Sequence, residues 1–197
     1  MLNVNEILKL HEDCVIKWHT LPAPDNTYDG ILQIICEEHK YNYLLWHQED
    51  MARNPHVTDS QIATVKRNID ILNQKRNDHI EMIDQNIIAL FLKEIKQFDN
   101  TLPLNSETPG SIIDRLSILS LRIYHMKEQT NRQDVTPEHI LKAQNKLKVI
   151  YEQQLDLATS LEQLLLDIKN KKKRLKIYYQ YKMYNDPTLN PQIYQKK

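Results

Sequence analysis

The chain has 197 residues and zero formal net charge, and it is long enough to form a sizeable core. Its two glycines are too few for a Gly-rich nucleotide loop. Its two cysteines form neither a disulfide framework nor a zinc knuckle. No apolar run reaches the roughly 18 residues of a membrane span, and the N-terminus lacks a signal-peptide pattern. We therefore expect a cytoplasmic protein with no transmembrane segment.

Three helices are predicted in the first half of the chain. The first covers about residues 3–19 and the second about 29–53. The second ends before Pro55, because proline disfavours helical geometry in the residue that precedes it. The third begins at Thr58 or Asp59, both of which are good N-terminal caps, and continues without glycine or proline to about residue 98.

Two further helices complete an all-α fold. A fourth is expected over about 111–131, and Thr136 with Pro137 begins a fifth that meets no helix breaker before Pro187. The two long helices would have about 40–50 residues and span roughly 60–75 Å, which is more than the width of a compact domain of this size. We predict an elongated bundle of about five helices, with a single domain over residues 1–184 and a C-terminal tail over 185–197.

Successive residues of a helix are rotated by 100° around its axis. With this rotation, charged and amide side chains fall on or beside the apolar faces of the second and third helices. On the second helix these residues are Glu38, Asn42, Glu49 and Arg53, with the apolar Trp46 beside them. On the third helix they are Lys66, Asp70, Asn73, Arg76, Asn77, Glu81 and Asp84. Burying an unpaired charge costs several kcal/mol, so these groups must satisfy one another, bind a ligand or face a wet cleft.

The short loop at 54–58 makes the second and third helices antiparallel neighbours. We therefore expect Glu38, Asn42, Lys66, Asp70 and Arg76 to meet in one place. Two interpretations remain open. The layer is either a ligand site or a structural network that sets the register of the helices.

As a ligand site, the layer suits an anionic small molecule with hydroxyl groups, such as a phosphosugar or a nucleotide sugar. The cations that contact the anion would be Arg53, Lys66 and Arg76. The amides that orient hydroxyl groups would be Asn42, Asn73 and Asn77. The carboxylates that act as catalytic base or hydroxyl acceptor would be Glu38, Asp70 and Asp84. The other predicted ligand-binding residues are Trp46, Glu49, Glu81, Lys182 and Tyr184.

An acidic motif offers a magnesium alternative. Glu81-x-x-Asp84 resembles half of the site with which all-α nucleotide pyrophosphohydrolases hold magnesium. The partner motif is incomplete, because Tyr41 stands where a third acid should follow Glu37 and Glu38. A magnesium-dependent nucleotide hydrolase is therefore kept as an alternative, and no other cofactor is expected.

The end of the predicted fifth helix is basic and aromatic. Residues 169–184 carry seven bases, four tyrosines and no acid. We favour a solvated helix face whose tyrosines dock on the body, and we do not expect nucleic acid as a partner. The eight histidines are scattered along the chain. We expect His19 and His47 to be packed or half-exposed rather than metal ligands.

The polar blocks also carry a family resemblance. They include Leu45-Trp46-His47-Gln48-Glu49-Asp50-x-Ala52-Arg53, Lys66-Arg67-x-Ile69-Asp70-x-x-Asn73-Gln74-x-Arg76-Asn77-Asp78-x-x-Glu81-x-x-Asp84, Tyr181-Lys182-Met183-Tyr184-Asn185-Asp186-Pro187 and Trp18-His19. These segments resemble a bacterial family known as domain of unknown function 4254. The resemblance implies a cytoplasmic helical protein encoded among surface-polysaccharide and glycosyltransferase genes, and no established reaction comes with it.

We therefore expect a helical protein that supports bacterial surface polysaccharide or lipopolysaccharide biosynthesis by binding a phosphosugar or nucleotide sugar in the polar layer. The competing interpretation is an interaction or scaffold protein in which the same residues form a buried network. Its long helices would pair with a second copy, as a homo-oligomer, or with a glycosyltransferase.

Overall fold

The computed structural model describes residues 2–95 and 98–194. Its helices are α1 (Val4–Trp18), α2 (Gly30–Arg53), α3 (Asp59–Ile95), α4 (Pro109–Thr130), α5 (Pro137–Lys169), a short 3-10 helix η1 (Met183–Asn185) and α6 (Pro191–Tyr194). No strand occurs among these residues apart from a single bridge between Leu104 and Arg174. The predicted all-α bundle is confirmed. None of the described helices is both long and apolar enough to cross a membrane.

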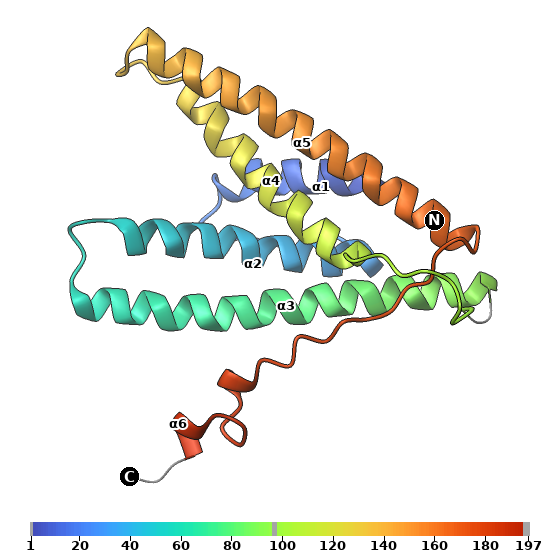
Figure 1. The fold of residues 1–197 in the computed structure, drawn as a ribbon. Helices are drawn as coiled ribbons and strands as arrows, with labels where there is room; N and C mark the ends of the chain where they lie inside the picture. Colours follow the sequence, from blue (N-terminus) through green and yellow to red (C-terminus); the bar gives the residue numbers. More distant parts are fainter. Residues whose placement is uncertain (1, 96–97, 195–197) are drawn as a thin grey trace.

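Two antiparallel helix pairs build the bundle. One pair is α2 with α3 and the other is α4 with α5, and α1 packs against α2, α4 and α5. Figure 1 shows the α4–α5 pair lying obliquely across the α2–α3 pair, with α1 behind α4. This crossing brings the first half of α4 against both α2 and α3.

All five long helices contribute to one hydrophobic core. Ile7, Ile35, Ile83, Ile113 and Leu161 come one from each helix and are fully buried. Burying one such side chain contributes about 1.5–3 kcal/mol. The core also contains Cys14 and Cys36, whose sulfur atoms lie 3.7 Å apart although the residues are 22 positions apart in the chain.

Local signals define where the helices begin. At the start of α3, the Gln61 backbone N–H donates to Thr58 Oγ1 (3.3 Å), and the Thr58 backbone N–H donates to Gln61 Oε1 (2.8 Å). This reciprocal pair is a capping box, which satisfies backbone donors that the helix itself leaves unpaired. At the start of α5, Thr136 Oγ1 accepts from the His139 backbone N–H, and Pro137 occupies the first helical position. Both starts agree with the prediction.

The end of α5 differs from the prediction. The helix ends at Lys169 rather than near residue 186, so α3 and α5 have 37 and 33 residues, not 40–50. Lys171 adopts a positive φ of 56°. The backbone N–H groups of Lys171 and Lys172 donate to the carbonyl groups of Ile168 (3.1 Å) and Asp167 (2.8 Å). These bonds form a Schellman motif, which ends the helix without glycine or proline.

The chain then returns along the body in an extended form. The Arg174 backbone N–H donates to the Pro103 carbonyl (3.1 Å), and Leu175 is buried in the core. Burial of Leu175 favours this turn over continuation of the helix into solvent. In Figure 1 the segment runs beside α3 and then leaves the body toward α6.

The tyrosines of this segment are exposed rather than docked. Tyr178 and Tyr179 are 48% and 47% exposed, and Tyr181 is 79% exposed. The prediction that they pack on the body is therefore wrong for these three. Tyr184 lies in η1, and its side chain lies outside the described part of the structure, as do residues 195–197 of the predicted tail.

Candidate functional site

A buried polar cluster joins α2 to α4. Asn42 on α2 is the centre, and its Nδ2 donates to Asp114 Oδ1 (2.9 Å) and Ser117 Oγ (3.0 Å) on α4. The same amide nitrogen contacts Glu38 Oε1, one turn earlier on α2. Glu38 and Ser117 are 0% exposed and Asn42 is 4% exposed. Each buried polar group therefore depends on the others for its hydrogen bonds.

His39 extends this cluster toward α1. Its Nε2 lies 3.1 Å from the His11 carbonyl oxygen and its Nδ1 lies 2.7 Å from Ser117 Oγ. A carbonyl oxygen can only accept, so Nε2 carries the proton and Nδ1 accepts from the Ser117 hydroxyl. Burial lowers the pKa of His39 to about 3, so the ring is neutral. The bonds thus form one directed chain from Asn42 through Ser117 and His39 to α1.

Two carboxyl groups and one guanidinium complete the cluster. Burial and the neighbouring Asp114 raise the pKa of Glu38 well above its ordinary value. A raised pKa favours the protonated form of Glu38, which relieves the repulsion between the two acids. Asp114 Oδ1 lies 3.1 Å from Arg76 Nε on α3. This ion pair brings the third helix into the same network.

A pocket of about 370 Å³ opens in front of this cluster, between α2, α3 and α4. Its lining residues are Asn42, Leu45, Trp46, Glu49, Asp50, Arg53, Asn73, Arg76, Ile118 and Leu121. Six of the residues that the sequence predicts for ligand binding line this one pocket. The six are Asn42, Trp46, Glu49, Arg53, Asn73 and Arg76.

Cations lie at several points around the pocket. Arg76 Nη1 is 3.4 Å from Asn73 Oδ1, and Nε faces Asp114. Arg53 Nη1 donates to the Glu49 carboxylate (2.8 Å) and to its carbonyl (2.7 Å). Lys182 Nζ donates to the Asn73 carbonyl (3.3 Å), so the returning C-terminal segment adds a third cation beside a lining residue.

Lys66 and Asp70 lie away from this cluster. Their side chains form an ion pair with each other along α3 and are 66% and 50% exposed. The prediction that they face inward and meet Glu38 is wrong. In this part of α3 the buried residues are Val65 and Ile69. Lys66 and Asp70 each follow one of them, so their side chains are rotated by 100° around the helix, toward solvent.

Three other predicted residues hold elements together rather than line the pocket. Asp84 Oδ1 accepts from the Gly110 backbone N–H (2.7 Å) at the start of α4, and burial raises the pKa of Asp84 to about 6. Glu81 Oε1 accepts from the Gln180 backbone N–H (3.0 Å) of the C-terminal segment. Asn77 is buried at 6% exposure and is not a lining residue.

The geometry does not favour the magnesium alternative. Glu81 and Asp84 bind backbone groups of different segments. A magnesium site between helices needs several carboxylate oxygens together. Within the described residues, no three acids bring ligand atoms within 4.8 Å of one another; the set that does so consists of three histidines.

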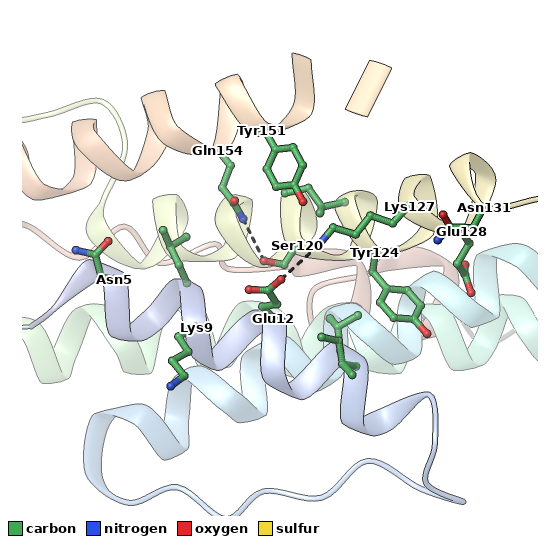
Figure 2. A pocket seen from close by; sticks show the side chains of 14 residues that line it. Asn5, Lys9, Glu12, Ser120, Tyr124, Lys127, Glu128, Asn131, Tyr151 and Gln154 are labelled. Carbon is green, nitrogen blue, oxygen red and sulfur yellow. Dashed lines mark hydrogen bonds and ion pairs between the residues drawn. The ribbon is translucent and has the colours of Figure 1, made fainter. Parts of the chain in front are cut away.

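A second pocket, which the sequence did not predict, lies between α1, α4 and α5. It has a volume of about 570 Å³. Figure 2 shows Asn5 and Lys9 toward one end and Tyr124, Lys127 and Glu128 toward the other. No single helix carries a signal for this groove, because it depends on how α1 sits against the α4–α5 pair.

These features define an all-α bundle whose polar pocket rests on a buried network of carboxyl, amide and imidazole groups. A family model described as "Protein of unknown function (DUF4254)" matches residues 32–177, and the chain belongs to this family. The match contains every residue that lines the polar pocket. No curated protein and no solved structure matches the chain.

Proposed function

We propose that the pocket between α2, α3 and α4 binds an anionic small molecule with hydroxyl groups, such as a phosphosugar or a nucleotide sugar. The observation that supports this most is the convergence of Arg76, Asn42, Asn73 and Trp46 on one open pocket. Through such binding the protein would support bacterial surface polysaccharide or lipopolysaccharide biosynthesis in the cytoplasm.

Arg76 is suited to hold the anionic group. Asp114 orients the guanidinium through Nε, and Asn73 contacts Nη1. The guanidinium lines the open pocket, so its remaining N–H groups can donate to a phosphate oxygen. An arginine that is already held in place loses less conformational entropy on binding than a free one.

Amides and an indole suit the hydroxylated part of the ligand. Asn73 on α3 offers its amide to a ligand, and Asn42 on α2 offers its carbonyl oxygen, because the Asn42 amide nitrogen is already bonded within the buried cluster. The Trp46 ring is held by stacking on His125, with ring centroids 4.7 Å apart and planes at 8°. A flat, held aromatic ring provides an apolar surface on which a sugar ring can pack.

The arrangement favours binding over catalysis. Glu38 is fully buried and does not line the pocket, so it is a poor general base. Asp84 bonds to α4 and Asp70 pairs with Lys66 on the surface. None of the three predicted catalytic carboxylates lines the pocket.

A second candidate function is pairing with another helix. The outer side of α5 exposes Leu141, Val149 and Leu155 at 58%, 50% and 67%. Large exposed apolar side chains on one helix suit a second copy of the chain or a glycosyltransferase partner. Light scattering during gel filtration tests for the homo-oligomer, and Leu155→Lys should shift a dimer toward monomer.

A thermal-shift screen tests ligand binding directly. The probes are glucose 1-phosphate, UDP-glucose and UMP, with glucose as the uncharged comparison. A probe at about 100 times its Kd stabilises the fold by about 2.7 kcal/mol, which raises Tm by roughly 5–10 °C in a chain of this size. We expect glucose 1-phosphate or UDP-glucose to raise Tm and glucose to have no effect.

Matched variants locate the binding. Asn73→Ala should reduce the Tm shift at a given probe concentration, because it removes an amide from the pocket wall. Asn68→Ala, on an exposed part of the same helix, should leave the shift unchanged. Absence of a shift with all three charged probes would contradict the proposal.

A further inference from the structure

Three histidines converge at a second place in the fold, away from the polar cluster. His19 ends α1, His47 lies on α2 and His125 lies on α4. Their ring centroids are 5.3 Å (His19–His47), 5.1 Å (His19–His125) and 5.9 Å (His47–His125) apart. One ring nitrogen from each lies within 4.8 Å of the other two.

The hydrogen bonds of two of these rings determine which tautomer the neutral ring adopts. His19 Nδ1 lies 2.7 Å from the Val15 carbonyl oxygen, and His125 Nδ1 lies 2.8 Å from Glu128 Oε2. A carbonyl oxygen and a carboxylate oxygen accept hydrogen bonds, so both Nδ1 atoms carry the proton. In the neutral rings, each Nε2 therefore presents a lone pair.

These two Nε2 atoms and that of His47 are buried and have no partner within the described part of the chain. Nε2 of His19, His47 and His125 is in each case shielded from solvent and has no hydrogen-bond partner among the described residues. Buried polar atoms without partners are uncommon in folded proteins, and each one calls for an explanation such as a bound ion. Three of them together, on three different helices, point to a shared Lewis acid.

We propose that His19, His47 and His125 bind a divalent transition-metal ion, with Zn²⁺ as the best-suited occupant, through their Nε2 atoms. Neutral imidazole is a preferred ligand of zinc, and three histidines leave a fourth tetrahedral position for water or a ligand atom. Zn–N distances of about 2.0–2.1 Å place the nitrogens roughly 3.4 Å apart. The three ring nitrogens lie within 4.8 Å of one another, so binding would draw them closer together.

The surroundings of the three rings fit a cation. Metal-bound histidines commonly donate their other N–H to a carbonyl or carboxylate, as His19 and His125 do here. The carboxylates of Glu128 and Asp50 act electrostatically on His47. Both carboxylates favour a cation at this place.

Aromatic packing holds the rings in place. His19 stacks on Tyr124 with centroids 4.1 Å apart, and His125 stacks on Trp46. Tyr124 and Glu128 also line the groove between α1, α4 and α5, where Figure 2 shows them toward the same end. The metal site would therefore adjoin one end of that groove, while Trp46 connects it to the polar pocket.

Zinc titration of the full chain tests the proposal. The protein is freed of metal by chelation, any affinity tag is removed, and Zn²⁺ is added in a calorimeter. We expect one ion per chain for the wild type and for His56→Ala, which removes an exposed loop histidine. His47→Ala should weaken binding by about 100-fold or more, and Glu128→Gln by about 10–100-fold. No binding, or equal binding by wild type and His47→Ala, would overturn the proposal.

A measurement on the wild type covers the case in which His47→Ala does not fold. Long-range proton–nitrogen NMR spectra report the state of each imidazole nitrogen. Before zinc is added, His19 and His125 should show protonated Nδ1. One equivalent of Zn²⁺ should shift the Nε2 signals of all three rings. If these signals stay where they are, the three rings are an aromatic cluster and not a metal site.

Discussion

Arg76 Nε and Asp114 Oδ1 lie 3.1 Å apart and connect α3 to α4 at the back of the polar pocket. The same carboxylate oxygen accepts from Asn42 on α2. Three helices therefore meet at one acid, whose side chain is only 9% exposed. This relationship sets the shape of the pocket, because its walls are the same three helices.

Arg76→Ala should destabilise the fold. It leaves the buried Asp114 charge without its cation next to Glu38. Loss of one partner of a fully buried pair costs about 3–5 kcal/mol, and Arg76 is partly exposed, so we expect about 2 kcal/mol. Arg115→Ala is the matched control, because its ion pair with Glu107 is exposed and should contribute less than about 1 kcal/mol. Urea unfolding measures both, and equal losses would contradict the structural role of Arg76.

Asp84→Asn should change how stability depends on pH. The folded-state pKa of Asp84 is raised from 3.8 to about 6, so the native state holds this proton more tightly than the unfolded state. As pH rises from about 4 to 7, the wild type should lose up to about 3 kcal/mol of stability from this group. Asparagine does not titrate, and it keeps an acceptor for the Gly110 N–H.

Unfolding at pH 4.5 and pH 7 therefore separates the two proteins. Relative to wild type, the free energy of unfolding of Asp84→Asn should be higher at pH 7 than at pH 4.5. Asp84→Ala, which has no acceptor, should be destabilised at both values. A difference between Asp84→Asn and wild type that does not depend on pH would show that Asp84 does not titrate as described.

Gly110→Ala tests how closely α4 approaches α3. A Cβ atom at Gly110 would lie 2.6 Å from the Ile80 carbonyl oxygen and 2.9 Å from Asp84 Oδ1. The helices must separate to admit a methyl group, at a cost of about 1–3 kcal/mol. Ser111→Ala, at the next position, adds no atoms and should have a smaller effect. Calorimetric unfolding compares the two, and a harmless Gly110→Ala would place α4 farther from α3.

Lys171→Gly should stabilise the protein. Lys171 has a φ of 56°, a conformation that costs an L-residue roughly 1–2 kcal/mol and glycine almost nothing. The larger freedom of glycine in the unfolded chain offsets part of the gain, so we expect about 1 kcal/mol, or roughly 2–4 °C in Tm. Lys172 does not have a positive φ, so Lys172→Gly should not stabilise the protein. Equal Tm values for the two variants would argue against a Schellman ending of α5.

Helix starts were predictable because their signals are local. The Thr58–Gln61 box and the Thr136–Pro137 pair lie within four residues of the backbone groups that they satisfy. The end of α5 was not predictable in this way. Lys171 takes the place that glycine usually holds, and Leu175 finds its burial against the core only in the folded protein.

The polar layer was predictable only in part. Helical periodicity correctly turned Asn42 and Arg76 inward, because it depends on each helix alone. Their partners Asp114 and Ser117 lie 72 and 75 residues from Asn42 on a helix that crosses at an angle, and no sequence spacing relates them. The same crossing leaves Lys66 and Asp70 uncovered, since α4 contacts α3 nearer Arg76 and Asp84.

The two tryptophans report directly on whether the polar pocket binds a hydroxylated anion. Trp46 lines the pocket, whereas Trp18 is buried and donates its indole N–H to the Asp25 carbonyl (2.9 Å). Their indole NMR signals can be assigned with Trp46→Phe and followed during titration with UDP-glucose and glucose 1-phosphate. If the pocket binds these ligands, the Trp46 signal moves and saturates while the Trp18 signal stays in place. A Trp46 signal that does not respond to either probe would contradict the proposal.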